Sequence, residues 1–174
     1  MAGPSGVGKG SVIACARENH PEIWLSVSAT TRLPRPGERD GESYFFLTRE
    51  QFERRIEAHQ MLEWAEYSGN LYGTPRGAVL AHLAEGRHVL LEIEVQGARQ
   101  IKRAMPEALL VLLKPPSWEE LERRLLGRAT EDPGELAMRL ATAREELGAE
   151  PEFDAVIVND HLGVAAAQLL SLME

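Results

Sequence analysis

The sequence predicts an α/β protein with a doubly wound parallel sheet, and three observations support this prediction. Short apolar runs that are typical of buried strands alternate with helical patterns along the whole chain. Polar and acidic residues follow several of these runs, at the strand ends where such folds bind their ligands. A glycine-rich segment at residues 3–11 comes directly before the first expected helix.

In the first half of the chain, turn and capping signals separate the expected elements. These elements are a helix at residues 9–19, strands at 23–27 and 44–47, a helix at 48–59, a hairpin at 62–72 and a helix at 74–86. Thr48 with Gln51 predicts a capping box for the second helix, and Gly69 follows Ser68 in the hairpin turn. Thr74 as N-cap, with Pro75 at the first helical position, predicts the start of the third helix.

The same alternation continues through the second half. Its expected elements are a strand at residues 88–93, a helix at 97–105, a strand at 108–113, helices at 117–126 and 132–147, a strand at 155–158 and a terminal helix. The continuous apolar run at 88–93 is typical of a buried parallel strand. Ser117 and Glu120 predict a second capping box.

The glycine-rich segment has the composition of a phosphate-binding loop. It reads Gly3-Pro4-Ser5-Gly6-Val7-Gly8-Lys9-Gly10-Ser11. Its glycines allow successive backbone N–H groups to converge on phosphate oxygens at a helix N-terminus, and Lys9 is expected to reach the β- and γ-phosphates. Gly10 stands where the usual pattern has a hydroxyl, which leaves Ser11 as the candidate magnesium ligand. Only two residues precede the loop, so we expect either that the natural chain begins earlier or that the strand that normally leads into the loop is missing.

Composition and charge argue against several classes of protein. A net charge of −8 argues against general nucleic-acid binding, and no apolar run approaches the length of a membrane span. Cys15 is the only cysteine, which excludes an internal disulfide and predicts a reducing, cytoplasmic location. The histidines have no metal-binding or metalloprotease spacing.

Four candidate site residues lie at or just past the ends of expected strands, on the same sheet edge as the loop: Ser28, Glu92, Glu94 and Asn159. Alternate residues of an extended segment point the same way, so Glu92 and Glu94 are expected to face magnesium, its waters or a ribose hydroxyl. The alternative is a pair of solvated charges at a strand end.

Arg32 and Arg35 lie on a proline-stiffened segment that suits bidentate binding of a second phosphate group. Tyr44 and Tyr72 are candidate neutral donors to the same group. Surface solubility is the alternative for the arginines, and buried packing is the alternative for the tyrosines.

A second group of arginines surrounds the breaker-rich segment 129–134. A hinge of this composition would let Arg128 and Arg139 move over a bound triphosphate, where they would stabilise the charge of a transferring phosphoryl group. Ion pairing with neighbouring glutamates is the alternative for Arg123.

Six motifs in order give the chain a resemblance to the guanylate kinases over its whole length. They are the loop and the segments 26–38, 63–65, 69–74, 92–97 and 158–160. The resemblance implies the P-loop nucleoside monophosphate kinase fold and transfer of the γ-phosphoryl of ATP to GMP or dGMP, with magnesium. It also implies a core at 1–32, 73–126 and 151–174, a strand-rich GMP-binding region at 33–72 and a helical lid at 127–150.

The resemblance assigns roles to individual residues. The GMP phosphate is held by Arg32, Arg35, Tyr44 and Tyr72, and the guanine is read by Ser28, Glu63 and Thr74. Guanine presents N1–H and N2–H₂ as adjacent donors, which a carboxylate such as Glu63 can accept together. The expected catalytic residues are Lys9, Arg32, Arg128 and Arg139, and Asn159 lies near the adenine.

A different function class stays open beside the kinase. Scaffold proteins reuse guanylate-kinase-like domains as non-catalytic modules that bind other proteins, and these typically lack the loop lysine and the lid arginines. Lys9, Arg128 and Arg139 are all present here, which favours the enzyme. The expected partners are the small molecules GMP and ATP, without nucleic acid or membrane, and the chain is expected to be a monomer or a homodimer.

Overall fold

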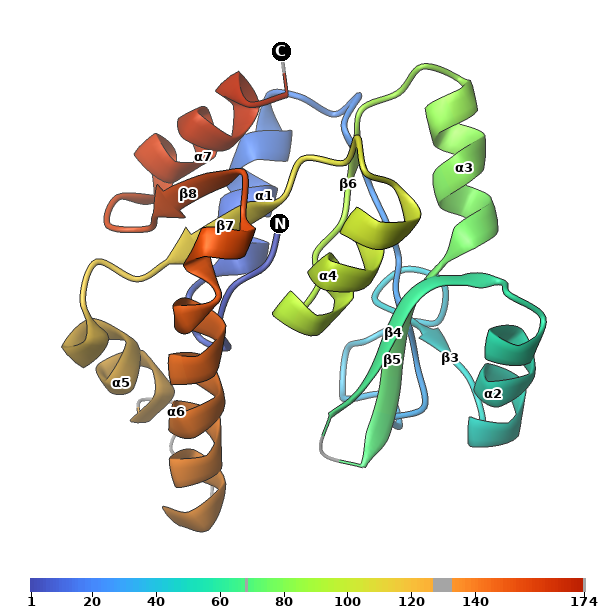
Figure 1. Ribbon diagram of the computed structural model, residues 1–174, viewed down its shortest axis with the longest axis horizontal. Helices are drawn as coiled ribbons and strands as arrows, with labels where there is room; N and C mark the ends of the chain where they lie inside the picture. The colour runs from blue at the N-terminus through green and yellow to red at the C-terminus, as the bar shows by residue number, and fades with distance from the viewer. Residues whose placement is uncertain (68, 127–132, 174) are drawn as a thin grey trace. The chain divides into compact units, whose positions relative to one another are not determined.

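The computed structural model describes residues 1–67, 69–126 and 133–173 (Figure 1). The backbone divides into two compact units, one formed by Met1–Pro21 with Leu109–Glu174 and the other by Glu22–Ala108. Each unit contains a parallel strand pair flanked by helices, which confirms the predicted α/β class. In the part of the chain that is described, no helix has the length and apolar character of a membrane span.

The first unit is built on the parallel pair of β7 (Val111–Lys114) and β8 (Ala155–Val158). On the opposite edge of β7, the Ala2 N–H donates to the Val111 carbonyl, and the Ala2 carbonyl accepts from the Leu113 N–H, both at 2.8 Å. The residues before the loop therefore form one parallel bridge with β7 rather than a strand.

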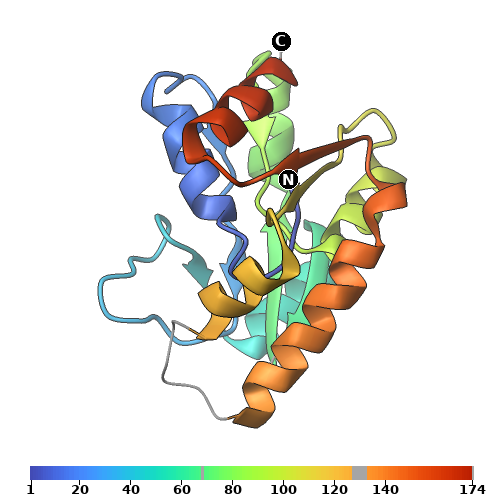
Figure 2. The ribbon, with the colours of Figure 1, turned by 90° about the vertical axis from the view of Figure 1, so that its left-hand side faces the viewer.

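Helices surround this strand pair. They are α1 (Lys9–Glu18), α5 (Trp118–Leu126), α6 (Pro133–Gly148), the 3₁₀ turn η1 (Glu150–Glu152) and α7 (Leu162–Ser171). Figure 2 shows α1 and α7 side by side. The Ser117 half of the predicted capping box forms, because Ser117 Oγ accepts from the Glu120 N–H at 3.2 Å. The Glu120 carboxylate pairs with Arg123 and Arg124 on the same helix.

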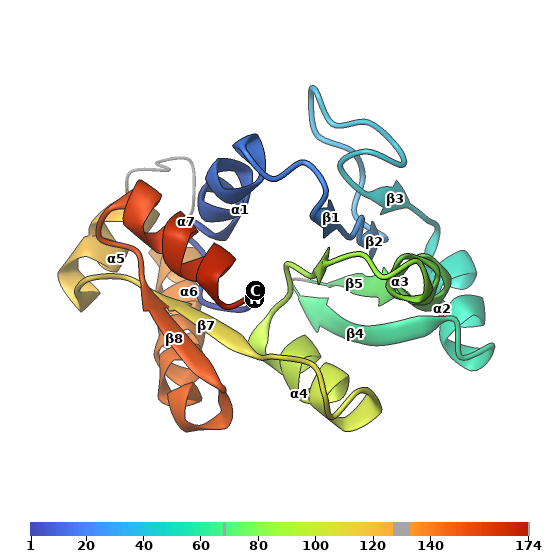
Figure 3. The same ribbon diagram turned by 90° about the horizontal axis from the view of Figure 1, so that it is seen from above.

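The second unit contains two sheets. β1 (Trp24–Leu25) pairs in parallel with β6 (Val89–Leu90). The other sheet has the order β3-β2-β5-β4, formed by β2 (Ala29–Thr30), β3 (Phe45–Phe46), β4 (Met61–Tyr67) and β5 (Asn70–Pro75). Its helices are α2 (Arg49–Glu57), α3 (Arg76–Ala84) and α4 (Val95–Ala104), and α4 runs beside β4 (Figure 3).

Two local predictions in this unit are confirmed. Thr48 and Gln51 form the capping box of α2, with both reciprocal hydrogen bonds present. This box directs Phe52 of α2 into a cluster with Ala29, Met61 and Leu71, where Phe52 is fully buried. The predicted hairpin is the antiparallel pair of β4 and β5, which meet at Tyr67 and Asn70.

Two other predictions are wrong. Thr74 does not cap α3, because it lies inside β5 and its hydroxyl donates to Glu63; the N-cap residue is Pro75. The strand predicted at 88–93 ends at Leu90. Its partner β1 is only two residues long, since the chain leaves β1 at Ser26 and enters the other sheet at Ala29.

Candidate nucleotide-binding sites

The phosphate loop leads into α1 through Gly8, which is the N-cap residue with a left-handed φ of 95°. A glycine cap has no side-chain oxygen, so it leaves the first N–H groups of the helix available to an anion. A Cβ on Gly8 would lie 2.6 Å from Nδ2 of Asn159, so any other residue at this position would have to displace that amide. This geometry is compatible with the predicted role of the loop in binding phosphate.

Lys9 follows Gly8 and is buried, with 8% of its surface exposed. Its Nζ donates to the carbonyl of Gly3, at the other end of the loop. The ammonium therefore lies across the loop, from its last residues to its first.

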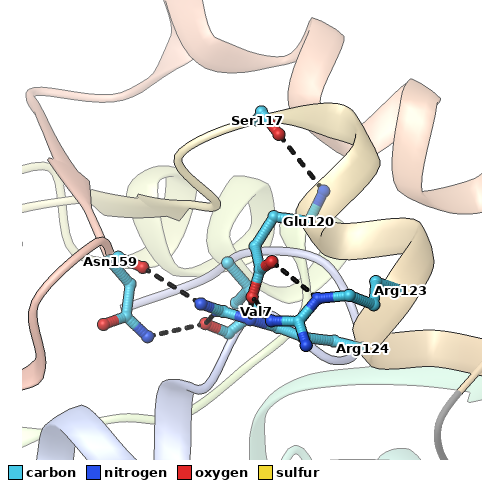
Figure 4. Close-up of polar contacts among 6 residues, drawn as sticks. All are labelled: Val7, Ser117, Glu120, Arg123, Arg124 and Asn159. Atoms are coloured by element: carbon cyan, nitrogen blue, oxygen red, sulfur yellow. Dashed lines mark hydrogen bonds and ion pairs between the residues drawn. The ribbon is translucent and has the colours of Figure 1, made fainter.

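Side chains from two distant segments hold the loop in shape (Figure 4). Asn159, which follows β8, donates from Nδ2 to the Val7 carbonyl at 2.8 Å. Arg124 of α5 donates to the same carbonyl at 3.3 Å, and its Nε is held by Glu120 at 2.8 Å. The two arginines beside Glu120 lower the pKa of its carboxyl, Arg123 having the larger effect.

This arrangement resolves one open point from the sequence. Arg123 pairs with Glu120 at 2.7 Å on an exposed helix face, so the ion-pair alternative for Arg123 is confirmed. Sequence reasoning did not foresee that Asn159 and Arg124 hold Val7, because these contacts join residues more than a hundred positions apart. The arginine cluster on α5 was the available signal.

Arg139 of α6 also reaches the loop. Its Nη2 donates to Ser5 Oγ at 2.7 Å, which brings a guanidinium to the predicted phosphate loop. The other expected lid residue, Arg128, lies outside the described residues. Gly10 and Ser11 are exposed on the first turn of α1.

In the second unit, β4 carries a buried carboxylic acid, Glu63. Only 5% of the Glu63 surface is exposed, and its Oε1 accepts from the Thr74 hydroxyl at 2.7 Å. Burial raises the pKa of Glu63 to about 7, against the hydrogen bonds from Thr74, which lower it, and with a smaller upward effect of Glu94. Two of the three predicted guanine-reading residues therefore meet directly.

Arg32 lies in a cluster with two of the other predicted phosphate-binding residues, Tyr44 and Tyr72. Its guanidinium forms two hydrogen bonds to the Glu38 carboxylate, at 2.8 and 3.0 Å. It also lies 5.4 Å from the ring centre of Tyr44, whose ring meets Tyr72 edge-on at 6.2 Å. Burial, with Glu92 as the next cause, raises the pKa of the Tyr44 hydroxyl.

Glu38 belongs to this cluster as well, although the sequence did not indicate it as a site residue. Its carboxylate accepts from the Arg35 backbone N–H at 2.7 Å as well as from Arg32, and the hydrogen bond from Arg32 is the main reason that the pKa of Glu38 is lowered. The Arg35 side chain is exposed. An acid six residues after Arg32, on a segment with two prolines, was the signal that could have identified the pair.

The remaining predicted residues lie near the starts of elements. Ser28 is half-buried, and its carbonyl accepts from the Phe45 N–H at 2.8 Å. Glu92 is half-buried, and Glu94 is exposed at the N-cap of α4. Asn159 belongs to the first unit and these three belong to the second, so their common edge stays a prediction.

The chain is similar to known proteins over almost its whole length. The sequence profile described as guanylate kinase matches residues 1–174. A guanylate kinase of Streptomyces coelicolor is 58% identical over 172 residues, which cover 99% of this chain and 87% of that protein. A guanylate kinase of Prochlorococcus marinus is 58% identical over 173 residues, covering 99% and 92%.

A solved structure agrees with these relatives. The crystal structure of guanylate kinase from Anaplasma phagocytophilum has a TM-score of 0.78 and 32% identity, and the match covers 98% of this chain and 80% of that one. Profile, relatives and fold thus coincide over almost the full length of the chain. The chain therefore belongs to the guanylate kinase family.

Proposed function

We propose that this chain is an ATP:GMP phosphotransferase, which transfers the γ-phosphoryl of ATP to GMP or dGMP and releases ADP and GDP or dGDP. The observation that carries the proposal is the buried Glu63–Thr74 pair, in a chain that also has a phosphate loop with its lysine. Membership of the guanylate kinase family over residues 1–174 supports the same function.

ATP is assigned to the loop of the first unit. Backbone N–H groups at the start of α1 would bind the phosphate oxygens, and Lys9 would neutralise charge on the β- and γ-phosphates. Arg139, which contacts Ser5 of the loop, would be the second cation that neutralises charge on these phosphates. Asn159 supports the Val7 carbonyl, and we assign it to the adenine side of the site.

GMP is assigned to the second unit. Arg32 forms a bidentate pair with the Glu38 carboxylate, and this geometry also suits a phosphate. Arg35, Tyr44 and Tyr72 are the further donors to that phosphate. The Glu63 carboxylate would accept N1–H and N2–H₂ of guanine, whereas adenine has a lone pair at N1 and would be repelled.

The chemistry requires no protein nucleophile. An oxygen of the GMP phosphate attacks the γ-phosphorus of ATP, the bond to the bridging β–γ oxygen breaks, and the electron pair leaves with ADP. Charge on the moving group is the main obstacle, so positioned cations such as Lys9 and Arg139 supply the catalysis.

Magnesium, when bound, supplies further neutralisation of the phosphate oxygens. Among the described residues, no three His, Cys, Asp or Glu side chains form a metal cluster, which fits an ion held mainly by nucleotide and water. Ser11, exposed beside the loop, is the residue that would contact it. We also infer a cytoplasmic location, in keeping with the single unpaired Cys15.

A coupled assay of ADP release tests the function, with GMP, dGMP, AMP and UMP as acceptors. The expected order is GMP, then dGMP, with AMP and UMP near background. Equal turnover of AMP would contradict guanine selection. Lys9→Met controls for contaminating kinases, because removing one preorganised donor to developing charge is expected to lower kcat by roughly 10²–10³-fold.

A further inference from the structure

Glu63 lies on an edge strand, β4, which is hydrogen-bonded to a neighbouring strand on one side only within the described chain. β4 is the last strand in the order β3-β2-β5-β4. A bulge lies directly before the acid, since Met61 pairs with Pro75 and Glu63 with Thr74, which leaves Leu62 without an opposite residue. Edge strands and bulges change where side chains point, so the direction of Glu63 depends on what fixes β4 here.

Gln100 of α4 supplies that support on the unpaired edge. Its Oε1 accepts from the Trp64 N–H at 3.2 Å, and its Nε2 donates to the Trp64 carbonyl at 2.6 Å. A side-chain amide carries a donor and an acceptor together, as a peptide group does. Gln100 therefore takes the place of a neighbouring strand at the residue immediately after Glu63.

Gly97 lies one turn before Gln100 on the same helix and is buried. A Cβ at this position would clash with Oε2 of Glu63 and would approach its Cδ to 2.9 Å. Glycine weakens a helix interior, and here its lack of a side chain lets α4 approach the carboxylate. Thr74 thus holds Oε1 from β5, while α4 bounds Oε2 from the opposite side.

We infer that Gln100 and Gly97 are positioning residues for base selection, which act on guanine through Glu63. The inference rests on the proposed function, in which both carboxylate oxygens accept from guanine at once. Two parallel hydrogen bonds tolerate little rotation of the carboxylate. If β4 were held less firmly, the Glu63 carboxylate would therefore lose one of its two hydrogen bonds to guanine while the protein stayed folded.

The first test is Gln100→Met, which removes both hydrogen bonds and keeps the length and helix preference of the side chain. Kinetics are measured with GMP and with inosine monophosphate, which lacks the 2-amino group of guanine. We expect KM for GMP to rise roughly tenfold, as for the loss of one hydrogen bond to a charged group. The preference for GMP over inosine monophosphate should fall by a similar factor, with kcat and KM for ATP unchanged.

Gly97→Ala tests the same inference from the other side of the carboxylate. The added methyl group should displace Oε2 and raise KM for GMP, again without an effect on KM for ATP. Arg103→Ala, at an exposed position of α4, is the matched control and should leave all constants unchanged. Thermal unfolding of each variant verifies that the protein is folded.

The outcomes separate the two proposals. If the wild-type chain does not phosphorylate GMP, the proposed function is wrong. If the wild type is active and Gln100→Met keeps both its KM for GMP and its base preference, the positioning role is wrong. An equal loss with GMP and ATP would also overturn it, because a general structural defect affects both substrates.

Discussion

Arg139 reaches the phosphate loop from α6 through its hydrogen bond to Ser5. Its charge is half-buried, which strengthens its interaction with an anion beyond that of a fully solvated arginine. This contact places the guanidinium beside the loop, where we propose that the triphosphate binds.

We expect Arg139→Ala to lower kcat by roughly 10²–10³-fold, because the guanidinium acts on charge that develops during transfer. KM for GMP should change much less. Steady-state kinetics with both substrates varied would measure the two effects. A large rise in KM for GMP at constant kcat would instead assign Arg139 to substrate binding, and Arg139→Lys indicates how much a point charge alone restores.

Glu63 makes the protein sensitive to pH, because burial raises its pKa from 4.5 to about 7. Between these values the unfolded chain releases the proton and the folded chain keeps it. The folded state then binds more protons, so the contribution of Glu63 to stability decreases as pH rises through this window and is constant above it. The full effect is roughly 3 kcal/mol.

The matched variant is Glu63→Gln, which cannot ionise. Relative to the wild type, its free energy of unfolding should increase as pH rises from about 4.5 to 7. Urea denaturation of both proteins across this range isolates the one group, since every other titrating residue is shared. A constant difference between the two curves would show that the carboxyl of Glu63 titrates normally.

At the scale of single elements, the capping box of α2 stabilises a helix that supports the sheet of the proposed GMP site. The capping box satisfies backbone donors at the first turn, and the helix then places Phe52 against Ala29 and Leu71 of the sheet that carries Glu63 and Tyr72. The helix itself contributes no residue to the proposed GMP site. Its role is to support the sheet.

Thr48→Ala should therefore lower the free energy of unfolding by about 1 kcal/mol, since it removes the cap that satisfies the Gln51 N–H. Thr142→Ala is the control, because Thr142 lies inside α6 and its hydroxyl bonds back to the Met138 carbonyl. There alanine is the better helix former, and the change should be neutral or stabilising. A free energy of unfolding that is unchanged or increased in Thr48→Ala would refute the capping role.

At the scale of the whole molecule, the two proposed substrates belong to different units. The phosphate loop, Asn159 and Arg139 lie in the first unit, and Arg32 and Glu63 lie in the second. A ligand stabilises the state that binds it, and this protection is largest in the segments whose backbone it orders.

Hydrogen exchange measured by mass spectrometry should therefore distinguish the two nucleotides. GMP alone is expected to slow exchange most in peptides from residues 22–108, and a non-hydrolysable ATP analogue most in the peptide that contains the loop and α1. AMP at the same concentration as GMP is the control for nonspecific binding to the second unit. Strong protection of the loop by GMP alone, with none in the second unit, would contradict the assignment.

Local secondary structure, which depends on residues close together in the chain, was predicted well from the sequence. The helix after the loop, the capping box at Thr48 and the hairpin around Gly69 all formed, because the residues that specify each lie within a few positions of one another. The role of Thr74 was mispredicted as a helix cap for a related reason. Its local pattern suits a cap, whereas its hydroxyl partner Glu63 lies on another strand.

The sequence by itself determined the α/β class, the phosphate loop and, through six ordered motifs, the family. The tertiary structure alone decided that Glu38 binds Arg32, that Asn159 holds Val7 and that Gln100 supports β4 beside Glu63. The division has a physical cause. Backbone propensity and capping act over one or two turns, while a side chain's partner and the pKa of a buried acid depend on which remote segments folding brings against it.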